Sequence, residues 1–209
     1  MVFYKCFCRG RLSSNSYLAY VNDGTAMVVD CGNDPYEIEE FAKSNNLTVK
    51  YIVLTHGHYD HVDYLDKFRV SFPDAKVISH KAETDVLASP HANVSLLFGD
   101  PKSYSAAQIT VSEGDVIRLG ESEGAVDFKV LSTPGHTPGS ICLYCEQEKL
   151  MFTGDTLFLG GRGRTDFLFG DEALMQKSLS RLLAMDGEIT FLSGHGSPSK
   201  ILYERGRIF

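Results

Sequence analysis

In the first half of the chain, short apolar runs alternate with segments whose apolar residues recur at helical spacing. Apolar runs bounded by turn residues predict strands, and Asn22-Asp23-Gly24 between the first two predicts a hairpin. Two helices are predicted from apolar residues that return to one face, the first opened by Pro35 and the second closed by Pro73. The predicted strands are residues 16–21, 26–30, 50–54 and 75–79, and the predicted helices are residues 35–46 and 62–72, the latter with Val62, Leu65, Phe68 and Val70 on its apolar face.

The second half follows a similar plan, with several strands before one helix and a last strand. Its predicted strands are residues 116–119, 126–131, 140–145, 150–152 and 189–192, and its predicted helix is residues 172–184. One apolar strand in each half ends in the same manner, at Thr55-His56 and at Ser193-Gly194-His195. Since ligand sites in α/β sheets gather beyond strand carboxyl ends, the match predicts two similar halves whose functional ends share one rim.

Residues 89–110 form a connection that is longer than usual and has no clear periodicity. Such a segment either covers a binding site or runs over the surface without a role. We treat it as a candidate lid or binding loop, with a plain surface excursion as the alternative.

Composition narrows the class of protein. The chain has 209 residues, a size that suits one domain with a sizeable core, and its formal net charge of -7 provides no broad basic field for nucleic acid. No apolar run approaches the roughly 18 residues that span a bilayer, and the N-terminus lacks the pattern of a secretory signal. We expect a cytoplasmic protein that acts on a small molecule, without nucleic acid or membrane partners.

The five cysteines include two close pairs, Cys6/Cys8 and Cys142/Cys145. In principle a C-x-C pair and a C-x-x-C pair can hold a structural zinc ion. Both pairs lie in runs that predict strands, and residues three apart on a strand point to opposite faces. We therefore interpret these cysteines as small buried hydrophobic residues in a reducing compartment.

A dense group of potential metal ligands follows a predicted buried strand, in the pattern His-x-His-x-Asp-His at residues 56–61. His56 and His58 lie two apart on a chain that leaves a strand, so both can face one ion. Asp60 and His61, at the turn into a helix, can face a neighbouring ion. Imidazole suits zinc, iron or manganese, and a carboxylate suits an ion that holds hydroxide. This segment therefore predicts ligands for two ions.

Three further candidate ligands, His136, Asp155 and His195, stand in turns that follow apolar strands. Glycines beside each of them let the backbone turn sharply, so that the side chain can face the rim of the sheets. Two other histidines, His80 and His91, are weaker candidates, and we do not assign them to the site.

These motifs, in this order, resemble the metallo-β-lactamase fold superfamily from about residue 15 to residue 197. The resemblance implies an α/β fold, a four-layer αββα sandwich with two similar halves, in one domain of residues 1–209. It implies two divalent metal ions, zinc first and iron or manganese otherwise, with a bridging hydroxide as nucleophile. The implied ligands are His56, His58 and His136 for the first ion, Asp60, His61 and His195 for the second, and Asp155 between them.

Particular residues narrow the branch of this superfamily. Asp155 stands where the zinc β-lactamases place a cysteine, and His58 stands where the diiron flavoproteins carry a glutamate, which disfavours antibiotic hydrolysis and oxygen reduction. The nucleic-acid-processing branch usually carries a large inserted domain, which 209 residues do not accommodate. The segments most similar to the short glyoxalase II relatives, hydroxyacylglutathione hydrolases, are residues 133–140, 153–158 and 161–167.

Glyoxalase II anchors glutathione with a C-terminal helical domain. This chain ends 14 residues after His195, so we expect its recognition of the thiol carrier to differ. Arg162 and Arg164 could present a fork to a substrate carboxylate. Alternatively, Arg164 pairs with Asp166 and holds the loop behind Asp155, which is the interpretation we favour.

The leading hypothesis is a metal-dependent hydrolase that cleaves a small thioester, ester or lactone, with Asp60 orienting the attacking hydroxide. The alternative is a persulfide dioxygenase of the same fold, in which one iron is held by the equivalents of His56, His136 and Asp155. A third possibility is a non-catalytic metal-binding module, which the full set of seven candidate ligands argues against. The sequence leaves the acyl group, the thiol carrier, the native metal and the oligomeric state open.

Overall fold

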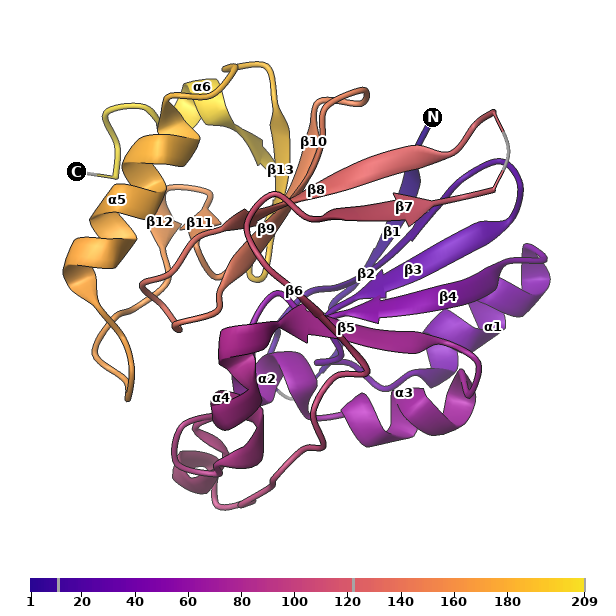
Figure 1. The fold of residues 1–209 in the computed structure, drawn as a ribbon, viewed down its shortest axis with the longest axis horizontal. Coiled ribbons are helices and arrows are strands. Elements are labelled where there is room, and N and C mark those ends of the chain that lie inside the picture. The colour runs from indigo at the N-terminus through magenta and orange to yellow at the C-terminus, as the bar shows by residue number, and fades with distance from the viewer. Residues whose placement is uncertain (11, 122, 209) are drawn as a thin grey trace.

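Two six-stranded sheets lie face to face in the computed structural model, which describes residues 1–10, 12–121 and 123–208 (Figure 1). The first sheet has the order β1 (Phe3–Phe7), β2 (Ser16–Tyr20), β3 (Thr25–Val29), β4 (Thr48–Val53), β5 (Lys76–His80) and β6 (Ile109–Val111). The second has the order β14 (Ser199–Lys200), β13 (Thr190–Ser193), β10 (Leu150–Gly154), β9 (Ile141–Cys145), β8 (Val126–Ser132) and β7 (Val116–Leu119). A separate hairpin pairs β11 (Leu157–Phe158) with β12 (Gly161–Arg162).

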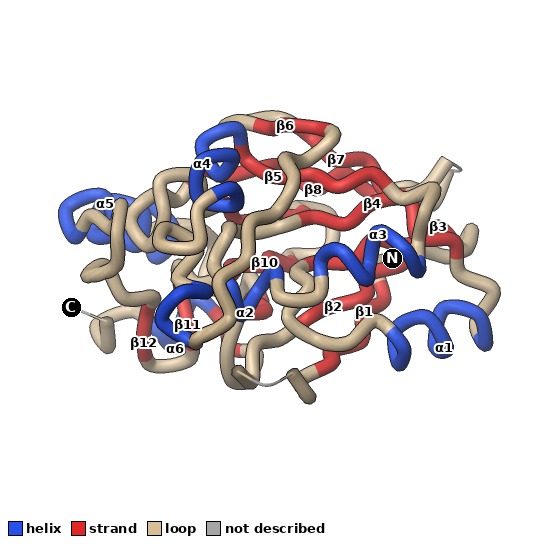
Figure 2. Tube along the Cα trace, turned by 90° about the horizontal axis from the view of Figure 1, so that it is seen from below, coloured by secondary structure: helices blue, strands red, loops and turns tan. Residues whose placement is uncertain are grey.

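Helices cover the outer face of each sheet (Figure 2). On the first sheet these are α1 (Tyr36–Ser44), α2 (Tyr59–Val62), α3 (Leu65–Ser71) and α4 (Thr84–Ala88), with the short 3₁₀ turns η1 (Lys81–Glu83) and η2 (Ser95–Phe98). On the second sheet they are α5 (Glu172–Leu183) and α6 (Ile201–Glu204). The four layers αββα that the resemblance implies are thus present.

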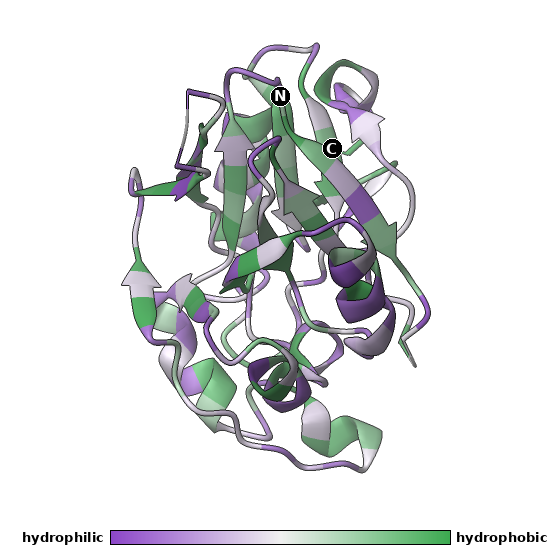
Figure 3. Ribbon diagram, turned by 90° about the vertical axis from the view of Figure 1, so that its right-hand side faces the viewer, coloured by the Kyte–Doolittle hydropathy of each residue, from purple (hydrophilic) through white to green (hydrophobic). Residues whose placement is uncertain are grey.

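Alternation along the strands produces these layers. In β3, Ala26 and Val28 pack toward the helices, whereas Met27 and Val29 pack toward the second sheet. A strand with both faces buried is apolar throughout, as β3 is, because each face must bury its side chains. Hydrophobic residues accordingly concentrate on the central strands in Figure 3. Phe128 and Phe152 are fully buried between the sheets, where each stabilises the fold by about 1.5–3 kcal/mol.

The predicted strands all appear, with ends within two residues of the predicted ones. The predicted helix over residues 62–72 is wrong in one respect, because the chain forms α2 and α3 with a break between them. At the break the Tyr64 amide donates to the Cys31 carbonyl oxygen, at 3.0 Å, instead of continuing the helical ladder of α2. Val70, predicted on the apolar face, is 81% exposed.

Several elements escaped the sequence pattern, among them β1, β6, α4, the short strands β11, β12 and β14, and α6. Strand β1 pairs only with β2 and buries Phe7 alone, so it lacks the alternation that a half-buried strand shows. The predicted loop at residues 89–110 contains η2 and the first residues of β6. It is therefore a structured segment.

The cysteine interpretation is correct for one pair and wrong for the other. Cys142 and Cys145 are buried on opposite faces of β9, the first toward α5 and the second between the sheets. Cys6 and Cys8 are exposed, because they lie on and just after the edge strand β1. Among the described residues, the groups that could hold a metal contain no cysteine. Among the described helices, none is long and apolar enough to cross a membrane.

Candidate metal centre

The structure brings all seven predicted ligands together at the ends of strands from both sheets. Four of them occupy the junction between β4 and α2, and the other three stand in the turn from β8 to β9 and directly after β10 and β13. Their donor atoms form three overlapping groups, within each of which all atoms lie within 4.8 Å of one another. The groups are His56 with His58 and His136, His56 with His61 and Asp155, and Asp60 with His61 and His195.

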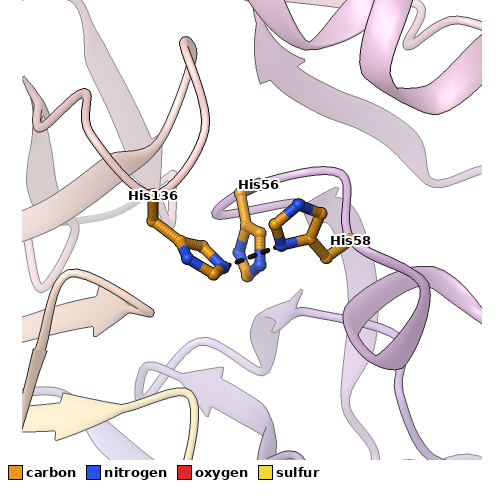
Figure 4. A group of neighbouring side chains, drawn as sticks. All are labelled: His56, His58 and His136. Carbon is orange, nitrogen blue, oxygen red and sulfur yellow. Dashed lines mark hydrogen bonds between the residues drawn. The ribbon is translucent and has the colours of Figure 1, made fainter. Parts of the chain in front are cut away.

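The first group, His56, His58 and His136, is buried, and its three imidazoles face one another (Figure 4). Nδ1 of His58 lies 2.7 Å from Nε2 of His136. Nε2 of His56 is buried and has no hydrogen-bond partner, which leaves an unsatisfied nitrogen facing the other two rings. Such a cluster of imidazole lone pairs is costly to bury unless a cation or a proton occupies it.

The other group at the far end, Asp60, His61 and His195, is more open, and we call it the second group. The remaining set, His56, His61 and Asp155, connects the first group to the second. Nε2 of His195 lies 3.0 Å from Oδ2 of Asp60 and 3.4 Å from Nε2 of His61. The side chain of His195 is 31% exposed, whereas that of His61 is fully buried. One edge of this group therefore faces solvent.

Asp155 lies between the two groups. Its Oδ1 is 3.2 Å from Nε2 of His61, and its Oδ2 is 3.5 Å from Nε2 of His136 and 3.6 Å from Nε2 of His195. One carboxylate thus contacts histidines of both groups, as expected for a ligand that two ions share.

Outer contacts orient the rings. Oδ2 of Asp30 lies 2.9 Å from Nδ1 of His61, and the same carboxylate accepts hydrogen bonds from the amide and hydroxyl of Thr55. The Arg164 carbonyl oxygen lies 2.7 Å from Nδ1 of His136. Partners on the far ring nitrogen fix the tautomer and orientation of metal-binding histidines.

Two glycines make room for the site. Gly154 has a φ of 47°, in the left-handed region that glycine adopts without a Cβ clash, and this turn aims the next residue, Asp155, at the rim. A Cβ on Gly194 would collide with Oδ1 of Asp155 and would lie 2.6 Å from Cε1 of His61. No side chain fits at position 194 while these two residues keep their places.

The electrostatics suit a bound cation. Burial lowers the pKa of His56 well below its usual range and that of His58 to about 3, so both imidazoles are neutral and offer lone pairs at pH 7. Burial alone would also lower the pKa of His61, but the carboxylates of Asp155, Asp60 and Asp30 outweigh it and raise that pKa well above its usual value. Positive charge is therefore favoured at this point, and the donor set fits metal ions that accept nitrogen and oxygen ligands.

A cavity of about 340 Å³ opens over the two groups. Its floor carries His58, Asp60, Asp155, His136 and His195, and its walls are Val94, Phe98, Phe158, Arg162, Gly163, Arg164 and Phe167. Val94 and Phe98 come from the segment predicted as a lid or binding loop, which therefore lines the cavity. Cavities of this size suit small ligands.

The metallo-beta-lactamase superfamily model matches residues 9–195 of this sequence. The chain belongs to this superfamily. Over 200 residues it is 32% identical to the probable metallo-hydrolase YqgX of Bacillus subtilis (strain 168), an alignment that covers 94% of this chain and 91% of that protein. Over 194 residues it is 30% identical to the hydroxyacylglutathione hydrolase GloC of Haemophilus influenzae, and this alignment covers 91% of this chain and 89% of that protein.

Solved structures of the superfamily superpose closely. BLEG-1, named a B3 metallo-beta-lactamase, gives a TM-score of 0.88 at 31% identity and covers 97% of this chain and 96% of its own. TTHA1623 in a di-iron-bound form gives 0.80 at 27% identity, with 98% of each chain covered. ETHE1 from Myxococcus xanthus gives 0.79 at 25% identity and covers 98% of this chain and 82% of its own.

Sequence reasoning missed two carboxylates that support this site, Asp30, which contacts His61, and Glu83. The buried carboxylate of Glu83 accepts hydrogen bonds from the amide of Gly57, at 2.6 Å, and from the amide of Gly139, at 2.7 Å. Gly57 separates two ligands of the first half, and Gly139 lies in the turn that carries His136, so Glu83 joins the two ligand loops. Its position just beyond the strand predicted at residues 75–79, on the expected rim, was the available clue.

Neither of the weaker candidate histidines belongs to the metal-ligand groups of the described residues. Nδ1 of His80 accepts a hydrogen bond from the amide of Ala82, and His91 is exposed. Arg164 forms a two-fold ion pair with Asp166, with both nitrogen–oxygen distances 2.6 Å, which agrees with the structural alternative. Arg162 pairs with Glu172 at 2.8 Å.

Proposed function

We propose that this metallo-beta-lactamase superfamily protein is a metal-dependent hydrolase of a small thioester, ester or lactone. The observation that carries the proposal is the convergence of seven nitrogen and oxygen donors, five of which line the floor of one cavity. Water adds to the substrate carbonyl, the bond to the sulfur or oxygen leaving group breaks, and the products are a carboxylic acid and a thiol or alcohol.

The residues divide the work. One ion would be held by His56, His58 and His136. A second ion would be held by Asp60, His61 and His195, and Asp155 would contact both ions. When bound, such a pair supplies hydroxide at neutral pH and polarises the attacked carbonyl; zinc is our first expectation, with iron or manganese as alternatives.

Asp60 is the proposed catalytic residue, because its side chain lines the cavity and also contacts the His195 ring. Burial alone would raise the pKa of Asp60, but His61 and His195 outweigh it and lower that pKa. The carboxylate therefore stays ionised at neutral pH, and it can accept a hydrogen bond from the attacking water and orient it. The apolar walls limit the water that reaches the carbonyl.

The test is metal analysis of protein purified without chelators, followed by assays on a panel of thioesters, esters, lactones and one β-lactam. We expect about two ions per chain and hydrolysis of thioester, ester or lactone, lost on chelation and restored by metal. Full activity after complete metal removal would overturn the proposal. Exclusive β-lactam hydrolysis would replace the substrate class, and a metal-bound but inert protein would favour the non-catalytic module.

The persulfide dioxygenase stays the second candidate, because Nε2 of His136 lies 3.5 Å from Oδ2 of Asp155 and His56 is grouped with each of them. Two histidines and one carboxylate, His56, His136 and Asp155, are a ligand set that suits a single iron with open positions. Iron-loaded protein that consumes oxygen with a persulfide, and that hydrolyses none of the panel, would decide for this function.

A further inference from the structure

Three phenylalanines stand among the seven residues that form the walls of the cavity. The Phe158 ring lies 5.8 Å from the His195 ring, and the Phe167 ring lies 5.7 Å from the His58 ring, both edge to face. The Phe98 ring stacks on Tyr59, which separates two of the candidate ligands, with 5.7 Å between centroids. We call Phe98, Phe158 and Phe167 the aromatic wall. It stands directly over the site at which a carbonyl would react.

The segment that carries Phe98 is held in place. The backbone carbonyl oxygen of Asn93, a buried residue of this segment, accepts a hydrogen bond from the Tyr59 amide at 2.7 Å. The side-chain amide of Asn93 donates to the backbone carbonyl oxygens of Leu87 and Lys102. Val94 has a φ of 61°, a left-handed conformation that is rare for a β-branched residue and persists only where its surroundings impose it. The part of the wall that Phe98 forms is therefore preformed.

The two arginines of the cavity already have anionic partners. Arg162 pairs with Glu172, and Arg164 pairs through two nitrogens with Asp166 while its guanidinium lies 4.0 Å from the centroid of the Phe167 ring. A substrate carboxylate would have to compete with these internal partners. Recognition of a charged acyl group is accordingly disfavoured.

Each of the three segments that carry the wall also exposes a leucine. Leu97, Leu159 and Leu168, each next in sequence to a member of the aromatic wall, are 64%, 50% and 42% exposed. Exposed apolar residues gathered around a cavity mark a binding surface more often than isolated ones do. The segments that carry the aromatic wall thus expose apolar side chains to solvent as well.

We propose that the acyl group of the substrate is apolar, an aliphatic chain or an aryl group, and that it lies against the aromatic wall with its carbonyl toward Asp60 and Asp155. This inference rests on the proposed hydrolase function and specifies its substrate class. The thiol or alcohol side points to the open edge at His195, where solvent reaches the site.

The experiment compares two series on the metal-loaded protein. In the first, the thiol is N-acetylcysteamine and the acyl group is acetyl, butanoyl, hexanoyl, octanoyl, phenylacetyl or succinyl. We expect kcat/KM to rise by up to about four-fold per methylene until the cavity is filled, and to be lowest for succinyl. In the second series the acyl group is hexanoyl and the thiol is N-acetylcysteamine or glutathione, and we expect less than a three-fold difference.

Variants of the aromatic wall test whether the preference for longer acyl groups arises there. Phe98→Ala and Phe167→Ala should lower kcat/KM for hexanoyl about ten-fold and for acetyl less than three-fold, and Phe167→Leu should retain most of the chain-length dependence. Tyr36→Ala removes an exposed aromatic ring of α1 and is the matched control, with no expected change in the series.

A binding measurement separates this inference from the proposed function. Ketone analogues, in which a methylene replaces the thioester sulfur, are titrated with the same acyl series. Affinity that rises with chain length in the wild type, and not in Phe98→Ala, supports the apolar acyl site whether or not any substrate is hydrolysed. If no substrate is hydrolysed, the proposed hydrolase function is overturned and the apolar acyl site is not. Affinity or kcat/KM that is flat with chain length, or highest for succinyl, would overturn the apolar acyl site.

Discussion

The two halves of the molecule contribute to the centre in different ways. The first half supplies four donors from one continuous run, residues 56–61, at a single strand-to-helix junction. The second half supplies His136, Asp155 and His195 from three turns, 19 and 40 residues apart. Local chain geometry places the first set, whereas the order of strands in the second sheet places the other. Contacts between the halves, such as those of Glu83, must hold the two sets in register.

The largest expected effect comes from Asp155, the carboxylate that contacts both groups. Asp155→Asn keeps the size of the side chain but removes its charge, so we expect kcat/KM to fall by at least about 100-fold and the metal content to fall below that of the wild type. Activity assays with metal analysis provide the measurement. Asp186→Asn, which removes an exposed aspartate paired with Lys149, is the control and should match the wild type.

Glu83 offers the sharpest test of how the halves are joined. Glu83→Gln keeps one carbonyl oxygen but replaces the second acceptor, so one of the two amides, Gly57 or Gly139, loses its partner. We expect metal affinity to fall about 10–100-fold, the range typical of contacts that orient ligands, as measured by competition with a chromophoric chelator.

A matched buried carboxylate controls for the loss of charge. Glu204 is fully buried and accepts hydrogen bonds from Gly160 and Ser199, outside the ligand loops. Glu204→Gln should leave metal affinity within about three-fold of the wild type if the effect of Glu83 is specific. Equal losses in the two variants would mean that Glu83 stabilises the fold without joining the ligand loops in particular.

Burial also makes Glu83 sensitive to pH. Desolvation raises its pKa from 4.5 to about 7, so the folded protein binds this proton more tightly than the unfolded chain does. Its contribution to stability is therefore full below pH 4.5 and declines as pH rises toward 7. Between pH 5 and pH 7 the free energy of unfolding should fall by about 2 kcal/mol more in the wild type than in Glu83→Gln, as measured by urea titration. Parallel pH profiles would contradict this prediction.

The two groups should differ in how readily they lose metal. The first is buried, whereas the second is open at His195. On chelation we expect two phases, with the faster one missing in His195→Ala and the slower one altered in His136→Ala. Metal release followed by stopped flow checks this order. A single phase in the wild type, or a fast phase that survives in His195→Ala, would contradict it.

The smallest effect is expected at Arg164. Its pair with Asp166 is exposed, and exposed ion pairs contribute little to stability. Arg164→Ala should shift the unfolding midpoint by no more than about 2 °C, because the contact to His136 comes from the backbone carbonyl, which the variant keeps. A large shift at low salt, abolished at high salt, would show that the pair does more than hold its own loop.

Sequence patterns predicted the strands well because most of the strands have both faces buried. A short continuous apolar run of this kind is typical of a buried strand and is unusual in a surface helix or a loop. They failed at β1, whose exposed face carries no such run, and at residues 62–72, where a hydrogen bond from Tyr64 to Cys31 divides the helix. Val70 shows the limit of periodicity, since an apolar residue at helical spacing faces solvent.

The amino-acid sequence predicted the seven candidate donors and grouped four of them at residues 56–61, because residues close along the chain must also be close in space. It gave no sign that Glu83 joins the ligand loops of the two halves, or that Phe98, Phe158 and Phe167 wall the same cavity. Those relations depend on how two sheets pack, and packing is set by side-chain contacts between segments far apart in the chain.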